Sequence, residues 1–190
     1  MVAISRAVRD EIVNHVHGIF LTLVRRLDAE ALGASSGPTA PSIGFHLWHS
    51  ARWADLLQAE APGMSDTLRD RLGPSKELWE HDGWAERFGV HVSAPGFRGT
   101  GMSAEPEEFA AMPLGDPALV VGYAEAAFGA VDLFLQAIDD EVLTERCMNL
   151  YGNRSSVGFV VVGHGQHLSR HLGSVEALIG VSGRPGTASI

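Results

Sequence analysis

Apolar residues recur every three or four positions along four long stretches of this chain, which is the period of an α-helix that buries one face. The predicted helices cover about 5–31, 42–60, 116–140 and 155–180. In the first of them the apolar stripe consists of Val8, Ile12, Val16, Ile19, Leu23 and Leu27. The pattern therefore predicts an all-α fold, in which four amphipathic helices pack as a four-helix bundle.

Residues with strong positional preferences mark the ends of these helices. Ser42 is suited to cap the second helix, and Asp116 followed by Pro117 is a typical start for the third. We expect the Ala-Pro-Gly sequence at 61–63 to stop the second helix, and Gly33 to end the first.

The stretch between the second and third helices, 62–115, is rich in glycine and proline. Short helical pieces are predicted there only at 76–88 and 104–112, so we interpret it as a long crossover between helices 2 and 3. The chain shows no second region of this kind. We therefore expect a single domain over 1–181, followed by a C-terminal tail at 182–190.

The composition of the chain limits which binding partners and which cellular compartment we expect. The 190 residues carry a formal net charge of −9 and show no basic patch, so we do not expect nucleic acid as a partner. The single cysteine, Cys147, excludes an internal disulfide and fits a reducing compartment. No apolar signal-peptide core is present, and the apolar run at 157–163 is too short to span a bilayer. These features predict a cytoplasmic protein that does not enter a membrane.

Three histidines lie close together in the sequence GHGQHLSRHLG of the fourth helix. His164, His167 and His171 are spaced by three and four residues, so all three should project from the face that also carries apolar residues. Burying several imidazoles without partners is unfavourable, and a metal ion is one way to satisfy them. Hydrogen-bonded core histidines are the other interpretation.

The second helix offers two more candidates in the sequence FHLWHSARW, His46 and His49. His49 belongs to the apolar stripe of that helix and should point inward. One histidine from this helix and two from the fourth would give three protein ligands, which leaves positions open for a catalytic metal. The HExxH motif of zinc proteases is absent, because Leu168 follows His167, and the Glu-x-x-His pairs of di-iron bundles are absent too.

The segments PSIGFHLWHSARWADLL (41–57) and HGQHLSRHLGSVEAL (164–178) resemble the DinB-like superfamily, a group with metal-dependent hydrolases and bacterial thiol-dependent S-transferases. The resemblance covers most of the chain and implies a bundle of DinB-like type with a long crossover. It also implies that the metal is held by His49, His167 and His171. His46 could be mistaken for His49, and the family does not settle the role of His164. From the residues alone, His15 on the first helix could reach the site.

The resemblance and the histidine pattern together predict a metal-dependent enzyme. No protein base stands out, so we expect the metal to activate a low-molecular-weight thiol of the mycothiol type for S-transfer. Alternatives are a metal-dependent hydrolase and a non-catalytic bundle with a structural or vestigial metal site. The cofactor is expected to be a divalent ion, zinc or nickel first, with iron or manganese as alternatives. Expected partners are a small-molecule substrate and a second copy of the chain in a homodimer.

Overall fold

The computed structural model describes residues 3–90 and 94–185. Its elements in chain order are α1 (Ile4–Asp10), η1 (Glu11–His17), α2 (Gly18–Val24), α3 (Ala29–Leu32), α4 (Ile43–Met64), α5 (Asp66–Leu72), α6 (Leu78–His81), α7 (Trp84–Arg87), η2 (Phe97–Gly99), α8 (Pro106–Ala110), α9 (Pro117–Gln136), α10 (Asp140–Thr144), β1 (Arg146–Met148), β2 (Arg154–Ser156) and α11 (Val157–Val181). The predicted all-α fold is therefore confirmed.

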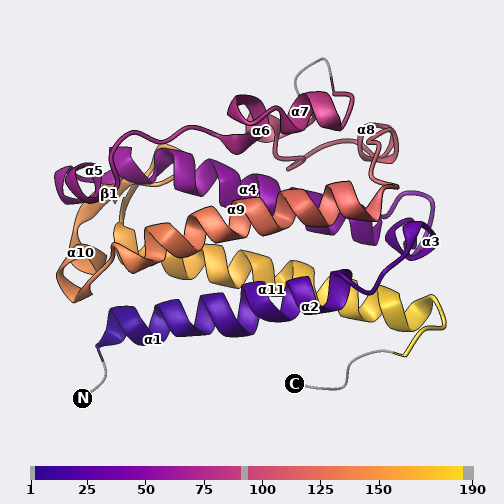
Figure 1. Cartoon of the computed structure of the whole chain (residues 1–190), viewed down its shortest axis with the longest axis horizontal. Coiled ribbons are helices and arrows are strands. Elements are labelled where there is room, and N and C mark those ends of the chain that lie inside the picture. Colours follow the sequence, from indigo (N-terminus) through magenta and orange to yellow (C-terminus); the bar gives the residue numbers. More distant parts are fainter. Residues whose placement is uncertain (1–2, 91–93, 186–190) are drawn as a thin grey trace.

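Four long helical rods form the bundle (Figure 1). The first rod is the continuous run of α1, η1 and α2, and the others are α4, α9 and α11. The first rod and α11 run in one direction, whereas α4 and α9 run in the other. α4 packs against both α9 and α11, and the first rod also packs against α9 and α11. The largest fully buried side chains of this core include Phe20, Trp48, Tyr123, Phe128 and Phe134.

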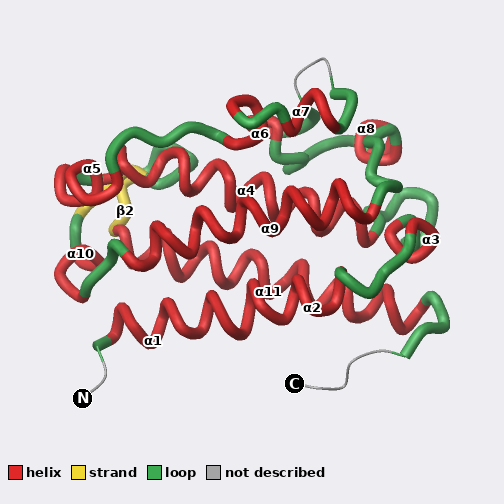
Figure 2. The backbone as a smooth tube through the Cα atoms, viewed as in Figure 1, coloured by secondary structure: helices red, strands yellow, loops and turns green. Residues whose placement is uncertain are grey.

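The crossover follows from the direction of α4 and α9. Because these two helices are parallel, the chain must return along the whole bundle before α9 can start (Figure 2). The short helices α5, α6, α7 and α8 lie on this return path. The predicted helical pieces at 76–88 and 104–112 contain α6 and α7 in the first case and α8 in the second. The long crossover between helices 2 and 3 is thus confirmed.

Two helix ends differ from the prediction. The second helix does not stop at 61–63 but continues to Met64, with Pro62 inside it. Proline lacks the backbone N–H that would bond to the carbonyl four residues earlier, so the last turn forgoes one hydrogen bond. The first helix ends at Val24 rather than near 31. A separate short helix follows because the side chain of Asp28 accepts a hydrogen bond from the backbone N–H of Ala31.

The hairpin of β1 and β2 was not predicted. The two strands pair antiparallel with Cys147 opposite Ser155, and Ser156 then caps α11. Each strand has only three residues, which is too short for an alternating pattern to stand out in the sequence. α11 ends at Val181, and residues 186–190 of the predicted tail lie outside the described residues. The division into one domain over 1–181 and a tail at 182–190 stays a prediction.

The segment η1 is a π-helix in the middle of the first rod. In a π-helix the hydrogen bonds join residues five apart instead of four, so the side chains that follow are rotated to a different face. His17 is consequently buried with Ile12 and Val16, whereas His15 is exposed. The prediction that His15 could reach the site is wrong for this reason.

Among the described residues, α9 is the one helix long and apolar enough to cross a membrane by length and composition, with a mean hydropathy of 1.6 over its most apolar window. The sequence analysis predicted this helix but considered only the run at 157–163 as a membrane span. In the structure α9 lies against α4, and Tyr123, Phe128 and Val131 are buried in the bundle core. This packing accounts for the buried share of the apolar window, which is 44%.

A buried carboxylate joins the crossover to the bundle. Asp55 of α4 is 0% exposed and accepts hydrogen bonds from the backbone N–H groups of Leu78 (2.7 Å) and Trp79 (2.8 Å) at the start of α6. The hydroxyl of Tyr123 on α9 donates to the same carboxylate at 2.8 Å. Burial raises the pKa of Tyr123, so this hydroxyl keeps its hydrogen. One side chain thereby connects α4, α6 and α9.

Arg52 completes this buried polar group. Its guanidinium donates to Asp55 at 3.2 Å and to Glu77, which precedes α6, at 2.7 Å. It also donates to the carbonyl of Gly99 at 3.0 Å, which fixes the far part of the crossover. A buried charge pair of this kind is stable only while both partners and their hydrogen bonds are present.

We predict that Asp55→Ala lowers the free energy of unfolding by about 3–5 kcal/mol, because it removes one partner of the buried guanidinium and leaves two backbone N–H groups without their acceptor. Urea unfolding followed by circular dichroism measures the change. Asp70→Ala on α5 is the control, because Asp70 is exposed, and it should change stability by less than about 0.5 kcal/mol. Equal effects of the two substitutions would show that Asp55 does not hold the crossover.

Candidate metal centre

The three predicted ligands meet where α4 packs against α11. The Nε2 atoms of His167 and His171 are 2.9 Å apart, and the Nε2 atoms of His49 and His167 are 3.3 Å apart. One nitrogen from each ring lies within 4.8 Å of the others. His167 and His171 meet because they are one turn apart on α11, whereas His49 joins them through tertiary packing. The structure thus brings together a set of three imidazoles that could hold a metal ion.

The hydrogen bond of His49 leaves its inner nitrogen free to act as a ligand. Its Nδ1–H donates to the backbone carbonyl of Thr100, a residue of the crossover. The lone pair is therefore on Nε2, which faces the other two rings. A histidine that binds a metal through one ring nitrogen usually donates a hydrogen bond from the other, and this bond fixes the orientation of the ring. Three neutral imidazole nitrogens suit zinc and other borderline divalent ions.

His46 lies behind His171 and does not face the centre. The Nδ1 atoms of these two rings are 2.8 Å apart, so one of them donates to the other. His46 therefore supports the outer side of His171 in the same way that Thr100 supports His49. The two histidines of α4 thus have different positions, and His49, the one in the predicted apolar stripe, is the one that faces the centre.

Burial keeps all three rings of the centre neutral. Burial, followed by the neighbouring histidines and by Arg170, lowers the pKa of His171 to about 2. Burial also lowers the pKa of His49 and of His167 to about 4, with smaller contributions from His167 and Arg170 respectively. A metal ligand must be neutral imidazole, so at neutral pH protons do not compete for these nitrogens.

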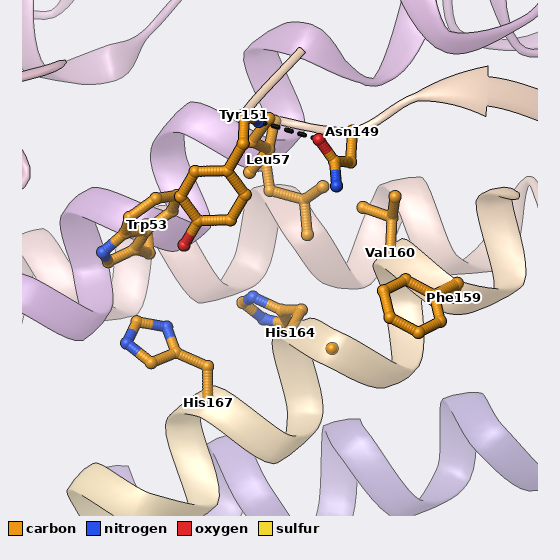
Figure 3. Close-up of a pocket in the computed structure, with 10 residues that line it drawn as sticks. Trp53, Leu57, Asn149, Tyr151, Phe159, Val160, His164 and His167 are labelled. Atoms are coloured by element: carbon orange, nitrogen blue, oxygen red, sulfur yellow. Dashed lines mark hydrogen bonds between the residues drawn. The ribbon is translucent and has the colours of Figure 1, made fainter. Parts of the chain in front are cut away.

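The centre is open on two sides. One opening is a hollow of about 460 Å³, lined by His46, by all three rings of the centre, by Arg170 and by residues 101–104 of the crossover. The other, called here the apolar pocket, has a volume of about 130 Å³ and is shown in Figure 3. It is lined by Trp53, Leu57, Asn149, Leu150, Tyr151, Phe159, Val160, Gly163, His164 and His167.

Aromatic rings form one wall of the apolar pocket. Phe97 stacks against Tyr151 and Trp53 with ring centroids 5.7 and 6.2 Å apart, and the edge of Trp53 meets His167 at 5.6 Å. Figure 3 shows Trp53 and Tyr151 on one side of the pocket and the two histidines on the other. The tryptophans of α4 differ in this respect, because Trp53 lines the apolar pocket whereas Trp48 is fully buried in the core.

The glycine-rich loop at 96–103 covers the centre, as expected for a segment that lines the mouth of a pocket. Gly101 has a φ of 82°, which favours glycine, and an added Cβ would lie 2.7 Å from the ring of Phe45 and 2.8 Å from that of Trp48. Only glycine lets the loop approach α4 so closely. This contact places the adjacent Thr100 carbonyl within reach of His49.

His164 does not join the centre, although it shares a face with His167. Its Nε2 lies 3.1 Å from Nε2 of His17 on the first rod, and Nδ1 of His17 lies 2.8 Å from a carboxylate oxygen of Asp132 on α9. The sequence analysis missed His17, Asp132 and Thr100. The only signal for His17 is its position five residues after Ile12, which is the π-helical period.

Cys147 and Arg154 line neither the histidine centre nor the apolar pocket. Cys147 is buried in β1, and burial raises the pKa of its thiol, which opposes a nucleophilic role. Arg154 is exposed on β2 and borders neither the centre nor the apolar pocket. Arg170, in contrast, borders the hollow beside the three histidines.

We predict that Gly101→Ala weakens zinc binding by about 10–100-fold, the usual effect of losing a partner that orients a ligand. The added methyl group would push the loop outward and take the Thr100 carbonyl away from His49. Isothermal titration calorimetry with zinc measures the affinity. Gly99→Ala is the matched control, because Gly99 also has a positive φ but a Cβ there meets nothing closer than 3.5 Å. An equal loss in both variants would attribute the effect to backbone strain alone.

We also predict that the metal-free protein loses stability between pH 7 and about 4. In the unfolded chain a histidine accepts a proton near pH 6.5, whereas His49 and His167 do so only near 4 in the folded protein. The unfolded state therefore binds more protons in this range, so the free energy of unfolding decreases as the pH is lowered. Urea unfolding at several pH values measures the slope. His49→Leu should reduce it, and the control His15→Gln, at an exposed position, should not.

Comparison with known proteins supports both the fold and the family. A search of the curated proteins found no match. A conserved protein from Enterococcus faecalis, solved as a crystal structure, superposes with a TM-score of 0.74 over 97% of this chain and 100% of its own, at 20% sequence identity, which shows a shared fold. A model of the DinB superfamily matches residues 14–175, a span that contains every residue of the histidine centre. On this evidence the chain belongs to the DinB superfamily.

Proposed function

We propose that this protein is a metal-dependent enzyme in which His49, His167 and His171 hold one divalent ion, zinc or nickel first. The observation that carries the proposal is the convergence of three neutral imidazole nitrogens, whose rings all border the larger opening, while His167 also borders the apolar pocket. A structural zinc site is usually closed by four protein ligands, whereas a catalytic site has three and keeps a position open. The openings therefore favour catalysis over a purely structural or vestigial site.

The bound ion would supply a Lewis acid and would lower the pKa of an S–H or O–H group at the open position. The chain's own residues do the rest. The apolar pocket excludes water from the apolar part of a small-molecule substrate, with Trp53 and Tyr151 as its wall. Arg170, at the rim of the other opening, is placed to hold an anionic group. Thr100 and His46 keep the ring orientations fixed from behind.

We propose S-transfer from a low-molecular-weight thiol of the mycothiol type as the reaction. The hollow of about 460 Å³ is large enough for a polar thiol, and the apolar pocket on the opposite side suits a hydrophobic electrophile. Hydrolysis is the second candidate, and a specific observation favours it: the neutral ring of His164 lies in the wall of the pocket. A cytoplasmic location and a homodimer remain part of this proposal as predictions.

Metal content and reaction rate together test the proposal. His49→Ala, His167→Ala and His171→Ala should each abolish most of the bound metal, because each removes one of three ligands. His46→Ala and His164→Ala are the controls from the same two helices, and should retain metal much better. Elemental analysis of purified protein measures occupancy. Full occupancy in His171→Ala would exclude the assignment.

The same variants then distinguish the reactions. Metal-loaded protein should accelerate conjugation of mycothiol or a simple alkyl thiol to a fluorogenic electrophile, and His167→Ala should not. Hydrolysis of a small aromatic ester, measured in parallel without thiol, is the competing reaction. Equal conjugation rates for metal-loaded and metal-free protein across several thiols would exclude S-transfer. A metal-dependent rate with the ester alone would establish hydrolysis in its place.

A further inference from the structure

A second group of titratable side chains lies beside the histidine centre but outside it. Asp132, His17 and His164 form a chain of hydrogen bonds that joins α9, the first rod and α11, with distances of 2.8 and 3.1 Å. Asp132 is partly exposed, at 27%, whereas His17 is 2% exposed and stacks on Phe128. The chain therefore runs from the surface of the bundle to His164, which borders the apolar pocket.

Two local features make this chain of contacts possible. The π-helical turn ending at His17 rotates that side chain inward, as described above. Gly165, the neighbour of His164, lets α11 approach the first rod, because a Cβ at this position would lie 3.1 Å from the side chain of Ile12. Both features serve the contact between the two rings. π-Helical turns in α-helices are frequent at functional sites, which fits a role beyond packing.

The hydrogen-bond partners determine which nitrogen carries the hydrogen in each neutral ring. The carboxylate of Asp132 can only accept, so Nδ1 of His17 carries a hydrogen. When the His17 ring carries this one hydrogen, its Nε2 is an acceptor, and Nε2–H of His164 must donate to it. It follows that Nδ1 of His164 carries a lone pair.

This lone pair has no partner within the described residues. In the part of the chain that the structure describes, Nδ1 of His164 makes no hydrogen bond. Four polar side-chain atoms there are fully buried without a partner, and Nδ1 of His164 is not one of them: Trp48 Nε1, Ser50 Oγ, Trp53 Nε1 and Glu145 Oε2. Nδ1 is therefore accessible, and the apolar pocket is the opening that His164 lines. A lone acceptor in an otherwise apolar wall selects a ligand that brings a donor.

We propose that the apolar pocket binds the apolar part of a small substrate that carries an O–H or S–H group, and that Nδ1 of His164 accepts this hydrogen while His17 and Asp132 position the ring. The inference rests on the proposed function, because it names the substrate class of the same site. The pocket volume, about 130 Å³, is close to that of a cavity of about 150 Å³ that binds benzene. One small ring or a short alkyl chain therefore fits.

The protonation state of His164 agrees with an acceptor role. Burial, followed by the neighbouring His17 and His167, holds the pKa of His164 well below its usual value. The ring is therefore neutral at physiological pH, and its lone pair is available. His164 would touch the substrate directly, whereas His17 and Asp132 would act only through it.

Nitrogen-15 NMR of the full chain, labelled at histidine and measured at pH 8 both zinc-loaded and metal-free, tests the tautomers. We expect His164 to carry its hydrogen on Nε2 and His17 on Nδ1. Asp132→Leu should convert His164 to a mixture of tautomers. Glu125→Gln is the matched control, because it removes the other ion-paired carboxylate of α9 and should leave both signals unchanged. A hydrogen on Nδ1 of His164 in the parent protein would overturn the proposal.

Phenol and toluene probe the pocket in the same samples. Phenol supplies an O–H donor and should shift the Nδ1 resonance of His164, whereas toluene, of equal shape, should not. Replacing His164 with leucine should weaken phenol binding by about fivefold or more, the effect of one lost hydrogen bond, and leave toluene binding nearly unchanged. Phenol that binds no better than toluene would overturn the proposal. Because the metal-free protein is measured too, this result is independent of whether the three other histidines bind metal.

Discussion

The geometry of the histidine centre depends on a carboxylate that does not touch it. Asp55 holds the start of α6 against α4 and α9, and its partner Arg52 holds the carbonyl of Gly99 farther along the crossover. The next residue, Thr100, orients His49. One buried charge pair thus fixes the loop that defines the third ring of the centre. Without it, α4 and α11 would still present histidines, but His49 would lose the hydrogen bond that selects its ring orientation.

The three rings of the centre are held by different means. His167 and His171 are set one turn apart by the α-helix itself, so their relation is local and stiff. His49 depends on the packing of α4 against α11 and on the crossover above it. Deformation of the crossover would therefore move one ring relative to the other two. A site assembled in this way can change its opening without unfolding either helix that carries it.

The sequence predicted the part of this structure that depends on local periodicity. Helical spacing identified the bundle, the crossover and the relation of His167 to His171, and the stripe of α4 pointed to His49. It could not predict that His164 turns to His17, because that depends on a π-helical turn whose propensity is not visible in the residues. Nor could it predict that Asp55 is buried, since a polar residue is assigned to the core only once its partners are known.

The partner of His49 is a main-chain carbonyl, which affects how far the sequence of the loop can differ between relatives that keep the site. A side-chain partner is lost by a single substitution, but a carbonyl is present whatever residue occupies position 100. The arrangement should therefore withstand many changes of residue in the loop while being sensitive to any change in its length. Relatives with very different loop sequences can retain the same support for the metal-facing ring, and an insertion of one residue can abolish it.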